Sequence, residues 1–120
     1  MKKEEVPRVA LISYRQLEEL LKVVEGLATN QVGMAWTGET VLASYHRILN
    51  QLKECFESDD KFKKAIEHLR PLDEKAPGHE LHHRIKADAH VLLGTLRAFI
   101  EWYLTPEEKK KIIGFSSDHD

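Results

Sequence analysis

Apolar residues recur with helical spacing in the first third of the chain. Residues three or four positions apart lie on one side of an α-helix, so this spacing predicts a helix with one buried face. Ser13 and Gln16 have the spacing of a capping box, which predicts a helix over about residues 14–30. Pro7 permits an alternative, a longer helix with the proline in its first turn. The apolar stripe consists of Leu17, Leu20, Leu21, Val24, Leu27 and Ala28.

The middle third contains a long apolar stripe followed by a short one. Thr37 is a favourable N-cap residue after a predicted loop at 30–36, and it indicates the start of a second helix. Ser58 is the predicted N-cap of a short third helix, which ends at Pro71 because proline cannot continue a helix. The two inner faces are Val41, Leu42, Tyr45, Ile48, Leu49, Leu52 and Phe56, and then Phe62, Ala65, Ile66 and Leu69.

The last third predicts a long helix and a short one. The long helix begins after Pro77, at about residue 78 or 79, and extends to about residue 104. Thr105, Pro106 and Glu108 form a complete start signal for a fifth helix that stops at Gly114. No segment alternates like a strand. We therefore predict an all-α four-helix bundle with a short additional C-terminal helix, in which residues 1–114 form a single domain and 115–120 a flexible tail.

Composition and charge narrow the class of protein. The 120 residues suffice for one domain with a real core, and 42% hydrophobic with 32% charged residues is typical of globular proteins. A net charge of −2 gives no basic excess for duplex nucleic acid. Cys55 is the single cysteine, so no intramolecular disulfide forms, and we interpret it as a buried small hydrophobe. With no membrane-length apolar run and no hydrophobic signal core at the start, we expect a cytoplasmic protein and no membrane partner.

The long helix predicted over 78–104 carries three different faces. The first is a core stripe, the second is apolar and mostly small, and the third is polar and rich in histidine. The core stripe is Leu81, Ile85, Ala89, Leu92, Leu96, Phe99 and Tyr103. The second face, called the small-residue stripe below, is Ala87, Val91, Gly94, Ala98 and Trp102. The third face is His79, His83, Lys86, His90, Arg97 and Glu101.

The small-residue stripe permits two interpretations. A helix that is apolar on two sides packs on two sides, and small residues let another backbone come close. The partner is either another helix of the same chain, as ordinary core packing, or the same helix of a second copy, as a homodimer interface.

The segment His79-Glu80-Leu81-His82-His83 matches H-E-x-x-H, in which two histidines bind zinc and the glutamate acts as a base. His79 and His83 share one side of the helix and are candidate ligands for a divalent metal. His90 lies about 10 Å further along the axis, so a third ligand must come from another helix. The motif also sits at a helix start, where the helix dipole disfavours a cation. Zincin metallopeptidases share only these five residues with the chain.

A second pattern overlaps the first. Arg84 is separated from His90 by five residues, and this pair resembles the Arg-x(4–6)-His signature of HEPN domains. The resemblance implies a small all-α bundle with the signature near the start of a late, long helix. It also implies a metal-independent endoribonuclease that acts as a dimer, or a related domain that binds nucleotides or partners. His90 would exchange protons and Arg84 would steady charge on the phosphate. The alternative is that Arg84 pairs with Glu80 or Asp88 and that His90 is solvated.

We prefer association over catalysis as the function. The predicted protein is a helical-bundle module that binds itself or a partner protein through the helix at 78–104, with an interface at the small-residue stripe. The HEPN-like ribonuclease, with RNA as a partner and Arg84 and His90 as its catalytic pair, is the first alternative. A metal site at His79 and His83 is the second. The sequence contains no motif for a small-molecule cofactor.

Overall fold

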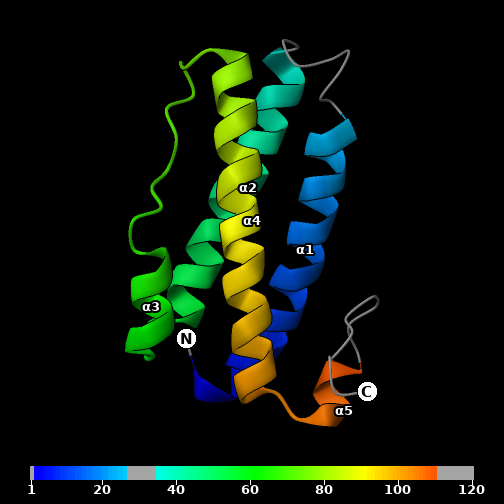
Figure 1. Cartoon of the computed structure of the whole chain (residues 1–120), viewed down its shortest axis with the longest axis vertical. Helices are drawn as coiled ribbons and strands as arrows, with labels where there is room; N and C mark the ends of the chain where they lie inside the picture. Colours follow the sequence, from blue (N-terminus) through cyan, green and yellow to red (C-terminus); the bar gives the residue numbers. More distant parts are fainter. Residues whose placement is uncertain (1, 27–34, 111–120) are drawn as a thin grey trace.

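The chain folds into helices joined by short connections, as a computed structural model of it shows (Figure 1). The structure describes residues 2–26 and 35–110, with side chains from residue 40 onward in the second range. The fold class predicted from the sequence is confirmed, since the described residues are all-α and contain no strand. The elements are η1 (Lys3–Glu5), α1 (Val6–Gly26), α2 (Ala35–Cys55), α3 (Asp60–Ile66), α4 (Gly78–Tyr103) and α5 (Pro106–Lys109).

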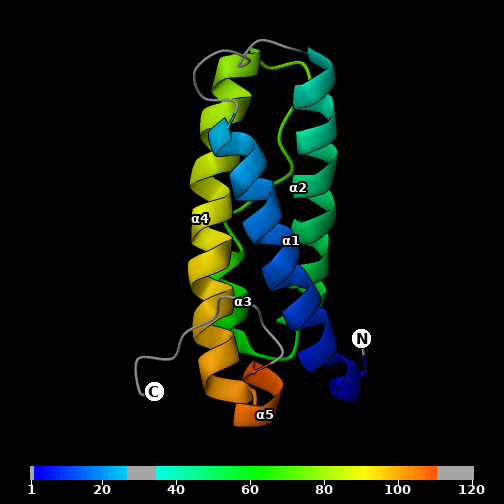
Figure 2. The ribbon, with the colours of Figure 1, turned by 90° about the vertical axis from the view of Figure 1, so that its right-hand side faces the viewer.

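Three long helices run side by side along the 42 Å axis of the molecule (Figures 1 and 2). α4 packs against both α1 and α2, and α1 and α2 pack against each other. The short α3 packs against α4 near the end from which α5 projects. Leucines, isoleucines and aromatic residues from all four bundle helices fill the space between them, so the interior is one continuous core.

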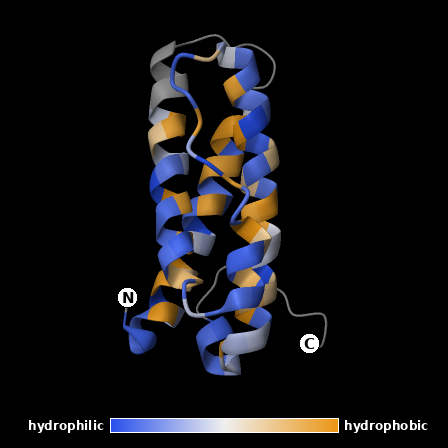
Figure 3. Ribbon diagram, turned by 90° about the vertical axis from the view of Figure 1, so that its left-hand side faces the viewer, coloured by the Kyte–Doolittle hydropathy of each residue, from blue (hydrophilic) through white to orange (hydrophobic). Residues whose placement is uncertain are grey.

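The segment from 67 to 77 covers the side of the bundle between α2 and α4 (Figures 1 and 3). Its backbone is tied to α2 at two points. The N–H of Leu72 donates to Nε2 of His46 at 2.8 Å, and Nζ of Lys53 donates to the carbonyl of Leu69 at 2.7 Å. The segment from 67 to 77 therefore covers the side between α2 and α4.

The start of α1 differs from the capping-box prediction. The helix begins at Val6, so Pro7 lies in its first turn, where the missing N–H costs no hydrogen bond. The alternative with the longer helix is thus the correct one. Ser13 is fully buried in mid-helix, and its hydroxyl accepts from Nε2 of Gln51 at 3.5 Å. The hydrogen bond to Gln51 on α2 explains why a polar residue occupies this buried position, and sequence spacing within α1 could not predict it.

Two other helix starts are also shifted. α2 begins at Ala35, two residues before the predicted N-cap Thr37. α3 is capped by Asp59 and not by Ser58, because the Asp59 carboxylate accepts from the N–H of Phe62 at 3.1 Å. The predicted end of the first helix near residue 30, the end of the last helix at Gly114 and the tail at 115–120 lie outside what the structure describes.

The long helix and its successor match the prediction. α4 spans Gly78–Tyr103, and Thr105 caps α5 in a complete capping box with Glu108. Within the predicted core stripe, the first six residues are buried but Tyr103 is 54% exposed. Ile100 occupies the buried position in its place.

Candidate interaction surface on α4

Polar contacts fix the rotation of α4 about its own axis on the side that faces α1. Nη1 of Arg97 donates to the hydroxyl of Tyr14 at 2.9 Å, and Nε2 of His82 lies 2.8 Å from the carbonyl of Val24. Because that carbonyl only accepts, Nε2 of His82 is the donor. Burial raises the pKa of Tyr14, while the Arg97 charge opposes the rise. These contacts hold two ends of the same helix–helix seam.

On the other side, a partly buried hydrogen bond holds α4 to α2. The Tyr45 hydroxyl donates to Oδ2 of Asp88 at 2.8 Å. Burial of the ring, followed by this bond to a carboxylate, raises the pKa of Tyr45 well above its usual range. The phenol therefore stays protonated and Asp88 stays fixed against the bundle.

The small-residue stripe faces solvent along its whole length. All five of its members are exposed, including Val91 at 40% and Trp102 at 70%. A methyl group added at Gly94 would meet no atom within 4 Å. The interpretation as ordinary core packing inside one chain is therefore wrong. The reason is that α1 and α2 together cover only the opposite side of α4.

Trp102 stands at the α3 end of the stripe. Nζ of Lys61 lies 4.6 Å from the centre of its ring, in cation–π geometry. Next to it, the Tyr103 hydroxyl donates to the Asp59 carboxylate, the same group that caps α3. This bond lowers the pKa of Asp59 and raises that of Tyr103. The end of the stripe is thus built from two helices.

The histidines do not converge on one point. His79 and His83 are exposed one turn apart, while the ring of His82 turns to Val24 and Nε2 of His46 is occupied by a backbone N–H. Among the described residues, no group of three or more His, Cys, Asp or Glu side chains is placed to hold a metal ion. A metal at His79 and His83 would need its remaining ligands from outside the described part of the chain.

Arg84 and His90 lie on opposite flanks of α4. Arg84 is exposed on the flank toward α2, where its charge acts on Tyr45. His90 lies on the flank toward α1, with Nε2 at 3.6 Å from the Glu25 carboxylate. The predicted pairing of Arg84 with Glu80 or Asp88 is absent from the described part of the chain. A single copy does not bring the two groups of the HEPN-like signature together.

Cys55 is buried, as predicted. Burial raises the pKa of its thiol to about 11, and Sγ lies 3.8 Å from the carbonyl of Val6. Its thiolate is scarce at neutral pH, so Cys55 is a packing residue and a poor nucleophile.

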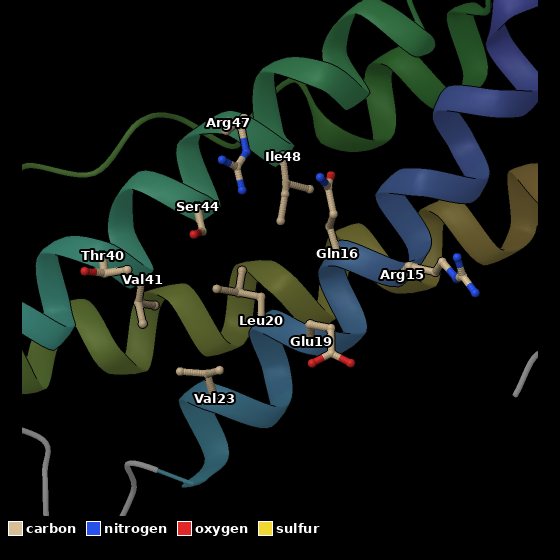
Figure 4. Close-up of a pocket in the computed structure, with 10 residues that line it drawn as sticks. All are labelled: Arg15, Gln16, Glu19, Leu20, Val23, Thr40, Val41, Ser44, Arg47 and Ile48. Carbon is tan, nitrogen blue, oxygen red and sulfur yellow. The ribbon is translucent and has the colours of Figure 1, made fainter. Parts of the chain in front are cut away.

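A groove between α1 and α2 escaped the sequence patterns (Figure 4). Its lining includes Val23, which is 47% exposed, and the charged side chains of Arg15 and Arg47. A usable signal existed on α1, where Ile12 and Val23 are apolar residues outside the predicted stripe. The groove itself, in which Val23 lies beside residues of α2, depends on the packing of α1 against α2, which local sequence patterns do not reveal.

No helix in the described ranges is long and apolar enough to cross a membrane.

The comparisons with known proteins give no indication of the family or function. The chain matches no protein-family model, and no curated protein or solved structure is significantly similar to it.

Proposed function

We propose that the chain is a small helical-bundle association module that forms a homodimer through the small-residue stripe of α4. The observation that carries this proposal is the exposure of all five stripe residues on a helix whose other apolar face is buried. An aligned apolar face that the described part of the chain leaves exposed is typical of an interaction site.

The composition of the stripe suits close packing of two helices. Ala87, Gly94 and Ala98 keep the side-chain layer thin, so a second backbone can approach. Trp102 is a large amphipathic side chain of the kind that is enriched at the energetic centres of interfaces. Its exposed ring would lose most of its contact with water in a dimer.

The order of large and small residues favours an antiparallel pair. If two copies of α4 meet about the point between Gly94 and Thr95, Trp102 lies opposite Ala87 of the second copy and Val91 lies opposite Ala98. Each large side chain then faces a small one, and the arrangement is self-complementary, as a two-fold interface requires. A parallel pair would instead set Trp102 against Trp102.

The same arrangement bears on the ribonuclease alternative. In the antiparallel pair, His90 and the second copy's Arg84 are separated by about 22 Å along the axis, from a rise of about 1.5 Å per residue. A composite site of the HEPN type needs them close together. We therefore propose association without RNA cleavage at these residues, and expect RNA incubated with the dimer to remain intact.

Sedimentation equilibrium of the untagged chain tests the proposal. The expected result is a dimer that Ala98→Glu converts to a monomer, because the carboxylate would be buried against Val91 of the second copy. The matched control is Ala43→Glu, which places the same group at an exposed position on α2 and should leave the dimer intact.

A size swap tests the register. Ala87→Trp and Trp102→Ala should each weaken the dimer, and the double variant should restore it, because the large and small residues only exchange places. A monomeric wild-type chain at all concentrations contradicts the proposal. If the Ala98→Glu variant remains a dimer, the interface lies elsewhere on the molecule.

A further inference from the structure

The groove between α1 and α2 is lined by apolar side chains from both helices (Figure 4). Its volume is about 300 Å³, and it contains no residue of α4. The apolar part of its lining consists of Leu20, Val23, Val41 and Ile48. Because α3 and the segment from 67 to 77 cover the side between α2 and α4, this groove is a side of the bundle that the described chain leaves uncovered.

The charges on its walls are unbalanced. Arg15 projects from the α1 wall and Arg47 from the α2 wall, and both are exposed. Within the described chain neither has an ion pair or a hydrogen bond. Glu19 on the α1 wall lies 3.6 Å from Nζ of Lys22, in a pair that is exposed to solvent. The lining thus contains two arginines and one glutamate as its charged residues, and its net charge is positive.

The apolar surface continues beyond the groove along α1. Ile12 and Val23 are 41% and 47% exposed, and they lie eleven positions apart on the same flank, about three helical turns. Gln16, between them, is held by Nε2 of Gln51 at 3.2 Å. An occupant that covered both exposed residues would have to be elongated and lie along the helix axes.

We propose that this groove docks an amphipathic α-helix of a partner protein, with an apolar stripe for the floor and acidic residues on both flanks. A helix laid between two antiparallel helices packs its ridge of side chains into their groove. Carboxylates on its two flanks would meet Arg15 on one wall and Arg47 on the other. The site shares no residue with the α4 stripe and does not depend on dimerisation.

The probe is a display library of 18-residue helices with a fixed leucine stripe and randomised flanking positions, selected on the immobilised full chain. Enriched peptides should carry Asp or Glu on both flanks. Their affinity should fall by roughly ten-fold in Arg15→Glu/Arg47→Glu, as two exposed ion pairs become repulsive. Substituting Lys for the acidic residues of the peptide should restore binding to that variant.

The matched control is Lys63→Glu/Arg70→Glu, which changes the net charge equally at exposed positions on α3 and in the segment after it, outside the groove lining, and should leave the affinity unchanged. Circular dichroism verifies that both double variants fold. The proposal would be overturned if no helix is enriched or if the enriched peptides have neutral or basic flanks. Equal affinity for the wild type and for Arg15→Glu/Arg47→Glu would also overturn it. So would amide shifts at Leu20 and Val41 on dilution or on titration with dodecanoate, which would assign the groove to a second copy or to a small amphiphile.

Discussion

Two apolar surfaces of this bundle face solvent, and they differ in shape and charge. The small-residue stripe is one side of a single helix, so it is convex and presents little side-chain bulk. The groove between α1 and α2 is concave and flanked by Arg15 and Arg47, which lack partners within the described chain. A convex, nearly neutral face whose large residues lie opposite small ones in an antiparallel pair complements a copy of itself. A positive groove cannot complement its own charge, so it suits a different partner.

The comparison also explains why both surfaces remain open. α1 and α2 use most of their apolar residues to cover one side of α4, and α3 covers only part of the seam between α2 and α4. α3 is only seven residues long. A bundle with one short helix lacks the fourth long helix that would cover the remaining apolar positions.

The largest expected effect is a difference in the free energy of unfolding between substitutions on the buried and on the exposed side of α4. Leu96 is fully buried, so Leu96→Ala should lower the free energy of unfolding by about 2–5 kcal/mol through a cavity in the core. Val91→Ala on the exposed side should change it by less than about 0.5 kcal/mol. Urea denaturation of both variants at a concentration where the chain is monomeric measures the difference. Equal losses would mean that the exposed side is structurally as important as the core.

Trp102→Ala should have the next largest effect, mainly on the affinity of the dimer. Loss of the aromatic side chain that packs against Ala87 of the second copy is expected to cost at least about 2 kcal/mol of dimer affinity, which is roughly 30-fold. In the monomer only the contact with Lys61 is lost, at about 0.5–1 kcal/mol. Sedimentation equilibrium and denaturation of the same sample separate the two effects. A large drop in monomer stability without a change in affinity would make Trp102 a structural residue.

A smaller effect concerns the α3 end of the stripe and depends on pH. The Tyr103 hydroxyl and then the N–H of Phe62 donate to the Asp59 carboxylate and lower its pKa. Because the folded pKa lies below the unfolded value of about 3.9, the contribution is present above that value. It is lost as the pH falls through the lower, folded value.

Asp59→Ala should therefore cost about 1 kcal/mol at neutral pH, the usual value of an N-cap, and much less in strong acid. Denaturation curves of the wild type and the variant across the acid range measure this. Asp59→Asn is the control, since an amide still caps the helix but does not titrate. A constant difference at all pH values would exclude the carboxylate as the source.

Local signals predicted some elements well and others badly, for a physical reason. The limits of α4 and the capping box of α5 depend on residues within one turn, such as Thr105 and Glu108, and both were predicted. The burial of Ser13 depends on Gln51 from another helix, so its spacing with Gln16 wrongly suggested a helix start. Periodicity identified the residues that share a face of α4. The core stripe is buried as predicted except at Tyr103, but periodicity did not show whether the small-residue stripe is covered as well. The groove was missed because it also depends on how the helices pack.

The smallest expected effect has opposite signs in the monomer and in the dimer. Gly94 lies in mid-helix with open space around it, so Gly94→Ala should stabilise the monomer by about 0.5–1 kcal/mol through the lower helix propensity of glycine. In the antiparallel pair the added methyl group meets Thr95 of the second copy and should weaken the dimer. Gly26→Ala, at the end of α1 and also without neighbours, controls for helix propensity. If Gly94→Ala strengthens both the fold and the dimer, the two copies do not cross at this point and the antiparallel register is wrong.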